Sequence, residues 1–309
     1  MDLMFLGTNA GVPTLQRNVT SIALRLYEER RSFWLFDCGE ATQHQILKSP
    51  LKLSKLEKIF ITHLHGDHLF GLPGLLASRN SQGGTSLLTV YGPKGIKEFL
   101  DTTLKLSQSR LDYDLEVVEH EGGVIFEDQG FVVESELLEH RIDSYGYRVT
   151  EKERIGTLNL ALLESLGIKP GPVYGKIKNG ESIELENGSV LLPEDVLGLP
   201  KKGRVVTILG DTRPCSSVIT LAQDADMLVH EATFLHEMVN TAYEYHHSTA
   251  VQAATAAMKA KAKCLVLTHF SSRYKDMEQL GGLLEEAKSI FPNTILAEEF
   301  HILPIERIQ

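Results

Sequence analysis

The sequence predicts an α/β protein in which helices cover the outer faces of mixed β-sheets. Two observations lead to this class. Short runs of β-branched and aromatic residues, which are typical of buried strands, alternate along much of the chain with segments of helical spacing. Blocks that contain only strands also occur, so we do not expect a purely parallel sheet with a helix after every strand.

The first third of the chain alternates the two kinds of element. Apolar runs that end at turn-forming residues predict strands at residues 3–6, 21–26, 33–36, 59–61 and 88–91. Helical spacing predicts helices at residues 41–47, 71–78 and 95–106. The aromatic side chains of these strands belong in the core, because a base-stacking surface would need them exposed. They are Phe33, Trp34, Phe36 and Tyr91.

The middle of the chain is rich in expected strands and is followed by a segment of different composition. Apolar runs predict strands at residues 115–118, 124–126, 131–138 and 145–149. From residue 150 to residue 202, prolines and glycines separate short apolar runs. An inserted arm and an ordinary excursion of short strands and turns explain this composition about equally well.

The last third returns to alternating elements. Strands are expected at residues 205–209, 227–229 and 264–267. Between the last two, residues 249–261 carry alanines at helical spacing, which predicts an amphipathic helix.

Composition limits the class of protein. The 309 residues, of which 42% are hydrophobic, suffice for one large domain or two small ones. A net charge of −10 argues against a general nucleic-acid coat but allows a local basic patch. No apolar run approaches the roughly 18–20 residues of a membrane span, and the first residues do not resemble a signal peptide. The three distant cysteines argue against a disulfide framework. We therefore expect a cytoplasmic protein without membrane association.

The segment from Thr62 to His68, THLHGDH, holds the densest group of potential metal ligands. His63, His65, Asp67 and His68 lie within six residues, directly after an expected strand. A single histidine in such a place is most often a hydrogen-bonded structural residue. Imidazole nitrogen suits zinc, however, and a carboxylate can bind one ion or bridge two. Three histidines and an aspartate packed this closely predict a metal site.

Further ligands are expected at the ends of other strands. His140, Asp211 and His269 each follow an apolar run, and polar residues at strand ends form the sites of open α/β sheets. Each signal is weak alone, because an aspartate after a glycine is most often a turn residue. Together they supply terminal imidazoles and one carboxylate that can lie between two ions.

With these residues the chain resembles the metallo-β-lactamase superfamily, whose fold is an αβ/βα four-layer sandwich of two mixed sheets with outer helices. Within it, the chain is similar over essentially its whole length to the ribonuclease Z family of transfer-RNA 3′-processing endonucleases. Besides THLHGDH, the matching stretches are FLGTNAGVP, RNVTS, LFDCGEATQHQ, GLPGLL, GDTR, HEATF, HHST and THFSSRY. The HEAT and HST motifs discriminate best, because the lactamase and glyoxalase branches lack them.

The resemblance implies the domain organisation and the metal ligands. Residues 1–309 would form one metallo-β-lactamase domain, with residues 150–202 inserted as a protruding, flexible arm that grips the transfer-RNA elbow. Two zinc ions per chain are implied, although His and Asp also suit manganese and iron. One ion would be held by His63, His65 and His140, and the other by Asp67, His68 and His269. Asp211 would bridge the two ions.

The resemblance also implies the reaction, which is removal of the 3′ trailer from precursor tRNA. A hydroxide between the two ions would attack the phosphodiester in line, leaving a 3′-hydroxyl on the tRNA and a 5′-phosphate on the trailer. Asp67 would orient the attacking water or accept its proton. The leaving oxygen needs a proton, for which His247 is the expected donor and Glu231 its partner. His246 is an alternative donor, and Glu231 with His247 could instead be a buried structural pair.

The expected RNA contacts fall in two regions. Near the site, cationic or amide side chains suited to phosphate are Arg17, Asn18, Arg213 and Arg273, although surface salt bridges would explain the arginines equally. In the inserted segment the family's arm is matched by Gly171, Pro172, Lys176 and Lys178. Residues 150–204 contain eight basic and eight acidic residues, but residues 165–180 contain three lysines and no acid. Such a cluster can follow phosphates, or it can be a solvated loop.

Two positions depart from the family pattern. Leu15 in PTLQRN stands where lysine is usual, at the loop that the family uses to distinguish precursors that already carry CCA. Asn9 stands where glycine is common, and we expect it to adopt the left-handed conformation that asparagine tolerates. The resemblance implies a homodimer in which one chain's arm positions RNA for the other's site. The alternatives are a small-molecule phosphodiesterase or thioester hydrolase, and a metal-stabilised binding module without activity.

Overall fold

The computed structural model describes residues 1–185 and 187–307, and the chain divides into two compact units. The first unit comprises Met1–Thr150 and Arg204–Glu306. The second comprises Glu151–Gly203 together with Arg307. Glu186, one of the acidic residues counted in the inserted segment, lies outside the described residues.

The first sheet of the larger unit has the strand order β16-β1-β2-β3-β4-β5-β6. Strands β3 to β6 run parallel, whereas β1 pairs antiparallel with β2 and β16, and β2 pairs antiparallel with β3. The strands are β1 (Asp2–Gly7), β2 (Ser21–Leu26), β3 (Ser32–Phe36), β4 (Leu56–Phe60), β5 (Leu88–Gly92), β6 (Leu115–Glu119) and β16 (Ile302–Pro304). Its helices are α1 (Thr42–Leu47), the 3₁₀ helix η1 (Leu53–Lys55), α2 (Gly66–Leu69), α3 (Leu72–Ser81) and α4 (Ile96–Leu106).

The second sheet has the order β15-β14-β13-β12-β9-β8-β7. Strands β12 to β15 run parallel, and β9 pairs antiparallel with β12. The strands are β7 (Gly123–Glu127), β8 (Phe131–Leu137), β9 (Tyr145–Glu151), β12 (Val205–Leu209), β13 (Met227–Glu231), β14 (Leu265–Thr268) and β15 (Thr294–Leu296). Its helices are α8 (Ser216–Leu221), the 3₁₀ helix η2 (His236–Met238), α9 (Val239–Tyr245), α10 (Ala250–Lys259) and α11 (Met277–Lys288).

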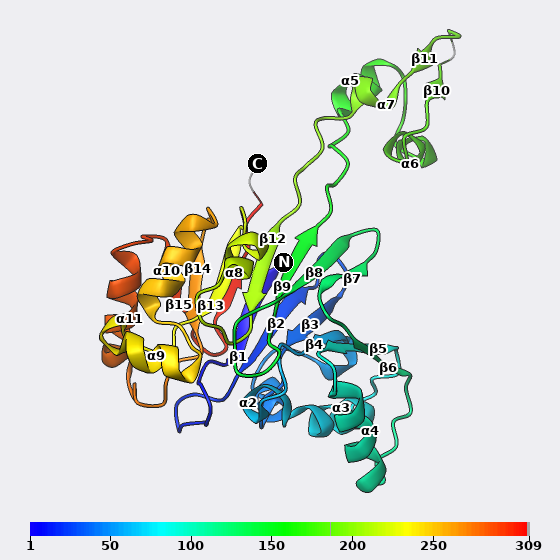
Figure 1. Ribbon diagram of the computed structural model, residues 1–309. Helices are drawn as coiled ribbons and strands as arrows, with labels where there is room; N and C mark the ends of the chain where they lie inside the picture. Colours follow the sequence, from blue (N-terminus) through cyan, green and yellow to red (C-terminus); the bar gives the residue numbers. More distant parts are fainter. Residues whose placement is uncertain (186, 308–309) are drawn as a thin grey trace. The chain divides into compact units, whose positions relative to one another are not determined.

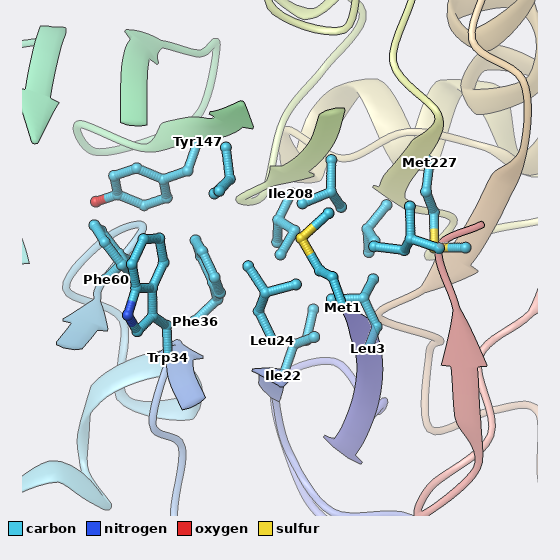
Figure 2. Close-up of a cluster of buried hydrophobic side chains, with 14 of the residues drawn as sticks. Met1, Leu3, Ile22, Leu24, Trp34, Phe36, Phe60, Tyr147, Ile208 and Met227 are labelled. Carbon is cyan, nitrogen blue, oxygen red and sulfur yellow. The ribbon is translucent and has the colours of Figure 1, made fainter. Parts of the chain in front are cut away.

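The two sheets form a four-layer αβ/βα sandwich, as predicted. One apolar cluster lies between the sheets and joins side chains of both, including Trp34, Phe60 and Tyr147 (Figure 2). A second cluster joins the outer face of the first sheet to α1, α3 and α4, and a third joins the outer face of the second sheet to α8, α10 and α11 (Figure 1). Each sheet is therefore apolar on both faces, which explains the continuous apolar runs in the sequence.

Successive side chains of β3 point alternately to the two faces of the first sheet, and both faces are covered by other parts of the protein. Trp34 and Phe36 point into the cluster between the sheets, whereas Phe33 and Leu35 pack under the helices. These aromatic residues, together with Tyr91, are buried. The prediction that they belong to the core is therefore confirmed.

The smaller unit has its own small core. Its elements are α5 (Leu160–Ser165), α6 (Pro172–Lys178), β10 (Ile183–Glu184), β11 (Val190–Leu191) and α7 (Pro193–Val196). Leu163, Ile177 and Val196 are buried in a cluster made only of residues from this unit. The unit's role as an RNA-binding arm remains a prediction.

Loops that follow strands of the two sheets are joined directly. The backbone N–H of Tyr145 donates to the carbonyl of Thr62 at 2.9 Å, and the N–H of Gly210 donates to the carbonyl of Tyr145 at 3.2 Å. A Cβ on Gly210 would lie 2.7 Å from the Thr62 side chain, so this approach requires glycine. The contact places His63, after β4, beside Asp211, after β12.

No helix in the described part of the chain is both long and apolar enough to cross a membrane.

Candidate metal centre

Seven expected ligands come together in the larger unit, where loops follow strands of both sheets. His63, His65, Asp67 and His68 follow β4, and the last two lie in the first turn of α2. His140 follows β8, Asp211 follows β12 and His269 follows β14. Their donor atoms fall into two groups, which are His63, His65, His140 and Asp211 on one side and Asp67, His68 and His269 on the other.

The first group surrounds the Nδ1 atom of His65. This nitrogen lies 3.0 Å from His63 Nε2 and 3.2 Å from His140 Nε2. Asp211 Oδ2 lies 3.7 Å from His63 Nε2 and 4.0 Å from His140 Nε2. Three imidazoles and one carboxylate oxygen thus face a common point.

The second group faces the other oxygen of the same carboxylate. Asp211 Oδ1 lies 3.5 Å from His68 Nε2 and 3.3 Å from His269 Nε2. Asp67 Oδ2 lies 3.5 Å from each of these nitrogens, which are 3.3 Å from each other. Asp211 therefore presents one oxygen to each group.

These spacings fit metal coordination. Around a tetrahedral ion with ligand distances of about 2.0–2.1 Å, donor atoms lie roughly 3.3–3.4 Å apart. The separations in both groups, from 3.0 to 4.0 Å, bracket that value. Imidazole nitrogens with carboxylate oxygen are a donor set that zinc and several other divalent ions accept.

Electrostatics at the site also favours a bound cation. Burial lowers the pKa of His63, His65 and His140, so these imidazoles are held in the neutral form that binds metal. Burial by itself would raise the pKa of the Asp67 and Asp211 carboxyls. The neighbouring histidines outweigh this effect, so the pKa of both carboxyls is lowered. The carboxylates therefore stay charged and attract positive charge to the space between them.

Asp37 fixes two of the ligands without facing the ion positions itself. His68 Nδ1 donates to Asp37 Oδ2 at 2.7 Å, which leaves His68 Nε2 for a metal. The Thr62 hydroxyl donates to the same oxygen at 2.9 Å and lies 3.0 Å from His63 Nδ1. Asp37 has a φ of 59°, a conformation that non-glycine residues rarely adopt. The sequence carried no signal for this role of Asp37 beyond its place directly after a strand, where the expected ligands also lie.

Buried Glu231 and half-buried His247 form a pair at the edge of the second group. Glu231 Oε1 accepts from His247 Nδ1 at 2.9 Å, and the same nitrogen lies 3.9 Å from Asp211 Oδ2. Burial lowers the pKa of His247, but the Glu231 carboxylate outweighs this effect and raises it to about 9. Glu231 is paired with His247 and not with His246, whose backbone carbonyl instead lies 2.9 Å from His140 Nδ1.

Thr233 links this pair to the metal ligands. Its hydroxyl lies 2.7 Å from Glu231 Oε2 and 3.2 Å from His269 Nδ1. Like Asp37, Thr233 contacts an expected ligand without facing the ion positions itself. Glu231 and Thr233 both belong to the HEAT motif, so the sequence indicated that this segment is part of the site. The contact between Thr233 and His269 could not be predicted from the motif.

The loop of residues 8–18 holds Asp67 from the opposite side. The backbone N–H of Gly11 donates to Asp67 Oδ2 at 2.8 Å. At the base of this loop, Glu299 Oε1 accepts from the N–H groups of Asn18 at 2.7 Å and Thr8 at 3.3 Å. Burial raises the pKa of Glu299 to about 7, although these donors act in the opposite direction. The sequence carried no signal for Glu299, which lies 281 residues from Asn18.

The conformation expected of Asn9 is wrong. Asn9 has no positive φ, and it is fully buried. Its amide donates to the carbonyl of Val12 at 2.5 Å, and its side-chain oxygen accepts from Arg17 Nε at 3.1 Å. The side chain thus crosslinks the loop, which a glycine could not do.

The residues expected to contact RNA differ in how accessible they are. Arg17 is buried and donates to Asn9 and to the carbonyl of Tyr274, and Asn18 donates to the carbonyl of Glu40 at 2.8 Å. Arg213 is half-buried, with a 3.2 Å ion pair to Glu139, whereas Arg273 is exposed. In the smaller unit the exposed residues of this set are Gly171, Pro172, Lys176 and Lys178. All of these RNA contacts remain predictions.

Comparison with known proteins identifies close relatives. Curated proteins named ribonuclease Z from Bacillus mycoides (strain KBAB4) and Bacillus cereus (strain AH187) are 56% and 55% identical over 308 residues. Each alignment covers 99% of this chain and 100% of the relative. A family model described as Anti-Pycsar protein Apyc1 matches residues 1–139, a stretch that contains THLHGDH and ends before His140.

Two solved structures are also similar to this chain. The crystal structure of human tRNase Z, short form (ELAC1), is 33% identical with a TM-score of 0.73, covering 99% of this chain and 100% of that one. The metallo-β-lactamase fold protein YhfI from Bacillus subtilis is 17% identical with a TM-score of 0.67, covering 97% of this chain and 98% of that one. The second match concerns the fold alone.

Replacing Asp37 by asparagine should weaken metal binding by about 10- to 100-fold, because the ring of His68 loses the acceptor that orients it. Asparagine tolerates a positive φ, so the backbone should be preserved. Competition with a chelator measures the affinity. Asp101→Asn, which changes an exposed carboxylate on α4, is the matched control. Equal affinities for the two variants would exclude this role of Asp37.

The Glu299 carboxyl should make stability depend on pH. Because its pKa rises from 4.5 to about 7 on folding, the folded chain binds more protons than the unfolded chain between these values. The stability contributed by this group is therefore fully present at low pH and is lost as pH rises towards about 7. Urea unfolding from about pH 5 to about pH 8 should show wild type losing stability relative to Glu299→Gln as pH rises. Glu298→Gln, at the exposed neighbouring residue, controls for the loss of one charge. A constant difference between wild type and Glu299→Gln would contradict the expectation.

Proposed function

The chain belongs to the ribonuclease Z family and is a hydrolytic endoribonuclease that processes the 3′ end of tRNA; on that premise we propose how it cuts. It removes the 3′ trailer from precursor tRNA with two zinc ions per chain, leaving a 3′-hydroxyl on the tRNA and a 5′-phosphate on the trailer. The observation that carries this proposal is the convergence of imidazoles from both sheets on the two oxygens of Asp211.

Enzymes of this family are metal-dependent, and the two groups of donor atoms suggest how the ions are held. His63, His65 and His140 would hold one ion, Asp67, His68 and His269 would hold the other, and Asp211 would contribute an oxygen to each. When bound, the ions lower the pKa of water so that hydroxide forms near neutral pH, and they neutralise charge on the phosphoryl oxygens.

The chain's own residues orient the reaction. The N–H of Gly11 holds Asp67 Oδ2, so the Asp67 carboxylate is fixed where it can orient the attacking water or accept its proton. On the leaving side, Glu231 holds His247 Nδ1 and supports the protonated imidazole. His247 Nε2 has no hydrogen bond to any residue that the structure describes, so it is available to give its proton to the leaving 3′-oxygen. The pairing with Glu231 favours His247 over His246 as the donor.

RNA is held by residues outside the metal centre. Residues 150–202 supply the arm, in which exposed Lys176 and Lys178 on α6 follow the Gly171-Pro172 turn and offer charge to phosphates. Near the metal centre, exposed Arg273 is available to RNA, whereas Arg17 and Arg213 support the loops beside it. The family resemblance supports a homodimer in which one chain's arm serves the other's site. It also supports the cytoplasm, where bacterial tRNA is processed, as the location.

The deciding experiment incubates the purified protein with a 3′-extended precursor tRNA, with and without chelator. We expect one cut, at the 3′ end of the mature sequence, that chelation abolishes and added zinc restores. Sequencing of both products maps the cut, and a 5′-phosphate-dependent exonuclease tests the trailer end. Asp211→Ala should lose both metal and cleavage, because no other carboxylate faces both groups of histidines among the described residues. Cleavage that persists in chelator would refute the proposal, as would activity confined to small diesters.

His247→Ala should slow cleavage by about 10²- to 10⁴-fold while leaving the metal content intact, because it removes only the proton donor. Glu231→Gln should shift the alkaline limb of the pH–rate profile to lower pH. The reason is that the Glu231 carboxylate raises the pKa of His247, and a neutral amide does not. Metal analysis and pH–rate profiles of both variants measure these effects. An unchanged rate in His247→Ala would move the donor role to His246 or to water.

A further inference from the structure

The last turn of α9 lies directly beside the metal centre. The carbonyl of His246, just past this helix, accepts from Nδ1 of the ligand His140 at 2.9 Å. His247 follows and pairs with Glu231. Tyr243 lies in the last turn of α9, and its carbonyl accepts from the backbone N–H of His246 at 3.2 Å, which places Tyr243 close in the chain to His247.

The ring of Tyr243 is exposed and yet held in place. Its relative exposure is 63%, and the Arg213 guanidinium carbon lies 3.8 Å from the ring centroid. Arg213 is itself anchored, because Nε donates to the carbonyl of Tyr243 at 2.8 Å and NH1 pairs with Glu139 at 3.2 Å. The anchored Arg213 guanidinium therefore covers one face of the Tyr243 ring, and the opposite face is open to solvent.

We propose that the open face of Tyr243 stacks on the base of the last retained nucleotide, the one whose 3′-oxygen leaves in the cleavage. The inference rests on the proposed function, because it places this nucleotide from the role of His247. The atom that receives the proton from His247 belongs to this nucleotide, so its base lies on the α9 side of the metal centre. Because the Tyr243 ring is already held in place, little conformational entropy is lost when a base stacks on it. Stacking is possible with any base, because each base has a π-face.

Charge complementarity favours RNA as the occupant. Arg213 and Arg141 flank this turn of α9, and Arg273 lies 5.1 Å from the ring of Phe234, which neighbours His247. A sugar-phosphate strand between these cations would bring its unpaired bases to the exposed ring.

Tyr245 provides a matched control on the same helix. It is 53% exposed and also has an arginine over its ring, but Arg141 lies 5.3 Å from the centroid. Among residues 1–185 and 187–307, the one hydrogen-bond partner of the Arg141 guanidinium is the carbonyl of Glu244, at 3.3 Å. Tyr245 is therefore exposed to a similar extent without being clamped in the same way.

Fluorescence tests the stacking directly. A precursor tRNA carries 2-aminopurine at the last retained position, and metal-loaded His247→Ala binds it without efficient cleavage. We expect the fluorescence to be quenched on binding, and most of the quench to be lost when Tyr243→Leu is added. Tyr243→Phe keeps the ring and should keep the quench, as should Tyr245→Leu. A quench that survives Tyr243→Leu, or that depends on Tyr245 instead, overturns the proposal.

Kinetics separates stacking from a structural role. In the otherwise wild-type enzyme, Tyr243→Leu should raise KM for precursor tRNA by about 5- to 100-fold, and Tyr243→Phe should restore it. An abasic last retained nucleotide should remove the difference between wild type and Tyr243→Leu. Equal losses on precursor tRNA and on bis(p-nitrophenyl) phosphate would show that the ring only supports the site, and would overturn the proposal. A wild-type enzyme that does not cut precursor tRNA counts against the proposed function, whereas cutting that Tyr243→Leu leaves unchanged counts against stacking alone.

Discussion

The site depends on one carboxylate, that of Asp211, which lies where the two sheets meet. Its two oxygens face imidazoles that follow strands of both sheets, at 3.3 to 4.0 Å. The backbone approach of Gly210 to Thr62 and Tyr145 makes this position possible. A side chain at residue 210 would separate the loops, and Asp211 would no longer face both groups of imidazoles.

Several acidic residues do not face the expected ion positions themselves but hold in place the side chains that do. Asp37 orients His68 directly and His63 through Thr62, Glu231 holds His247, and Glu299 fixes the loop that reaches Asp67 through Gly11. These carboxylates lie behind the ligands and each accepts several hydrogen bonds, which lowers the cost of burying a charge. The ligand geometry is thus built into the fold by hydrogen bonds that hold side chains in place.

The residues expected to contact RNA differ in how accessible their charges are. An enzyme with a net charge of −10 attracts RNA only where cations gather locally. Arg17 and Arg213 were expected to meet phosphates, yet their guanidinium groups are largely occupied by backbone carbonyls and by Glu139. Of the cations expected to contact RNA, the exposed ones are Arg273 in the larger unit and Lys176 and Lys178 in the smaller unit, so the acidic total charge still leaves local cations accessible.

The sequence alone predicted the layers of the fold and the residues that gather at the candidate metal centre. Continuous apolar runs such as residues 33–36 indicated strands that are buried on both faces, and the density of THLHGDH predicted a metal site, because both signals are local in the chain. Short helices such as α8 and α9, and the edge strands β15 and β16, were missed, since neighbours that are distant in sequence stabilise them. Only the tertiary structure revealed the contacts of Asp37, Thr233 and Glu299, the exposed ring of Tyr243 beside Arg213, and the true conformation of Asn9. Each is defined by a partner brought close by folding, and the spacing of residues along a chain carries no record of such a contact.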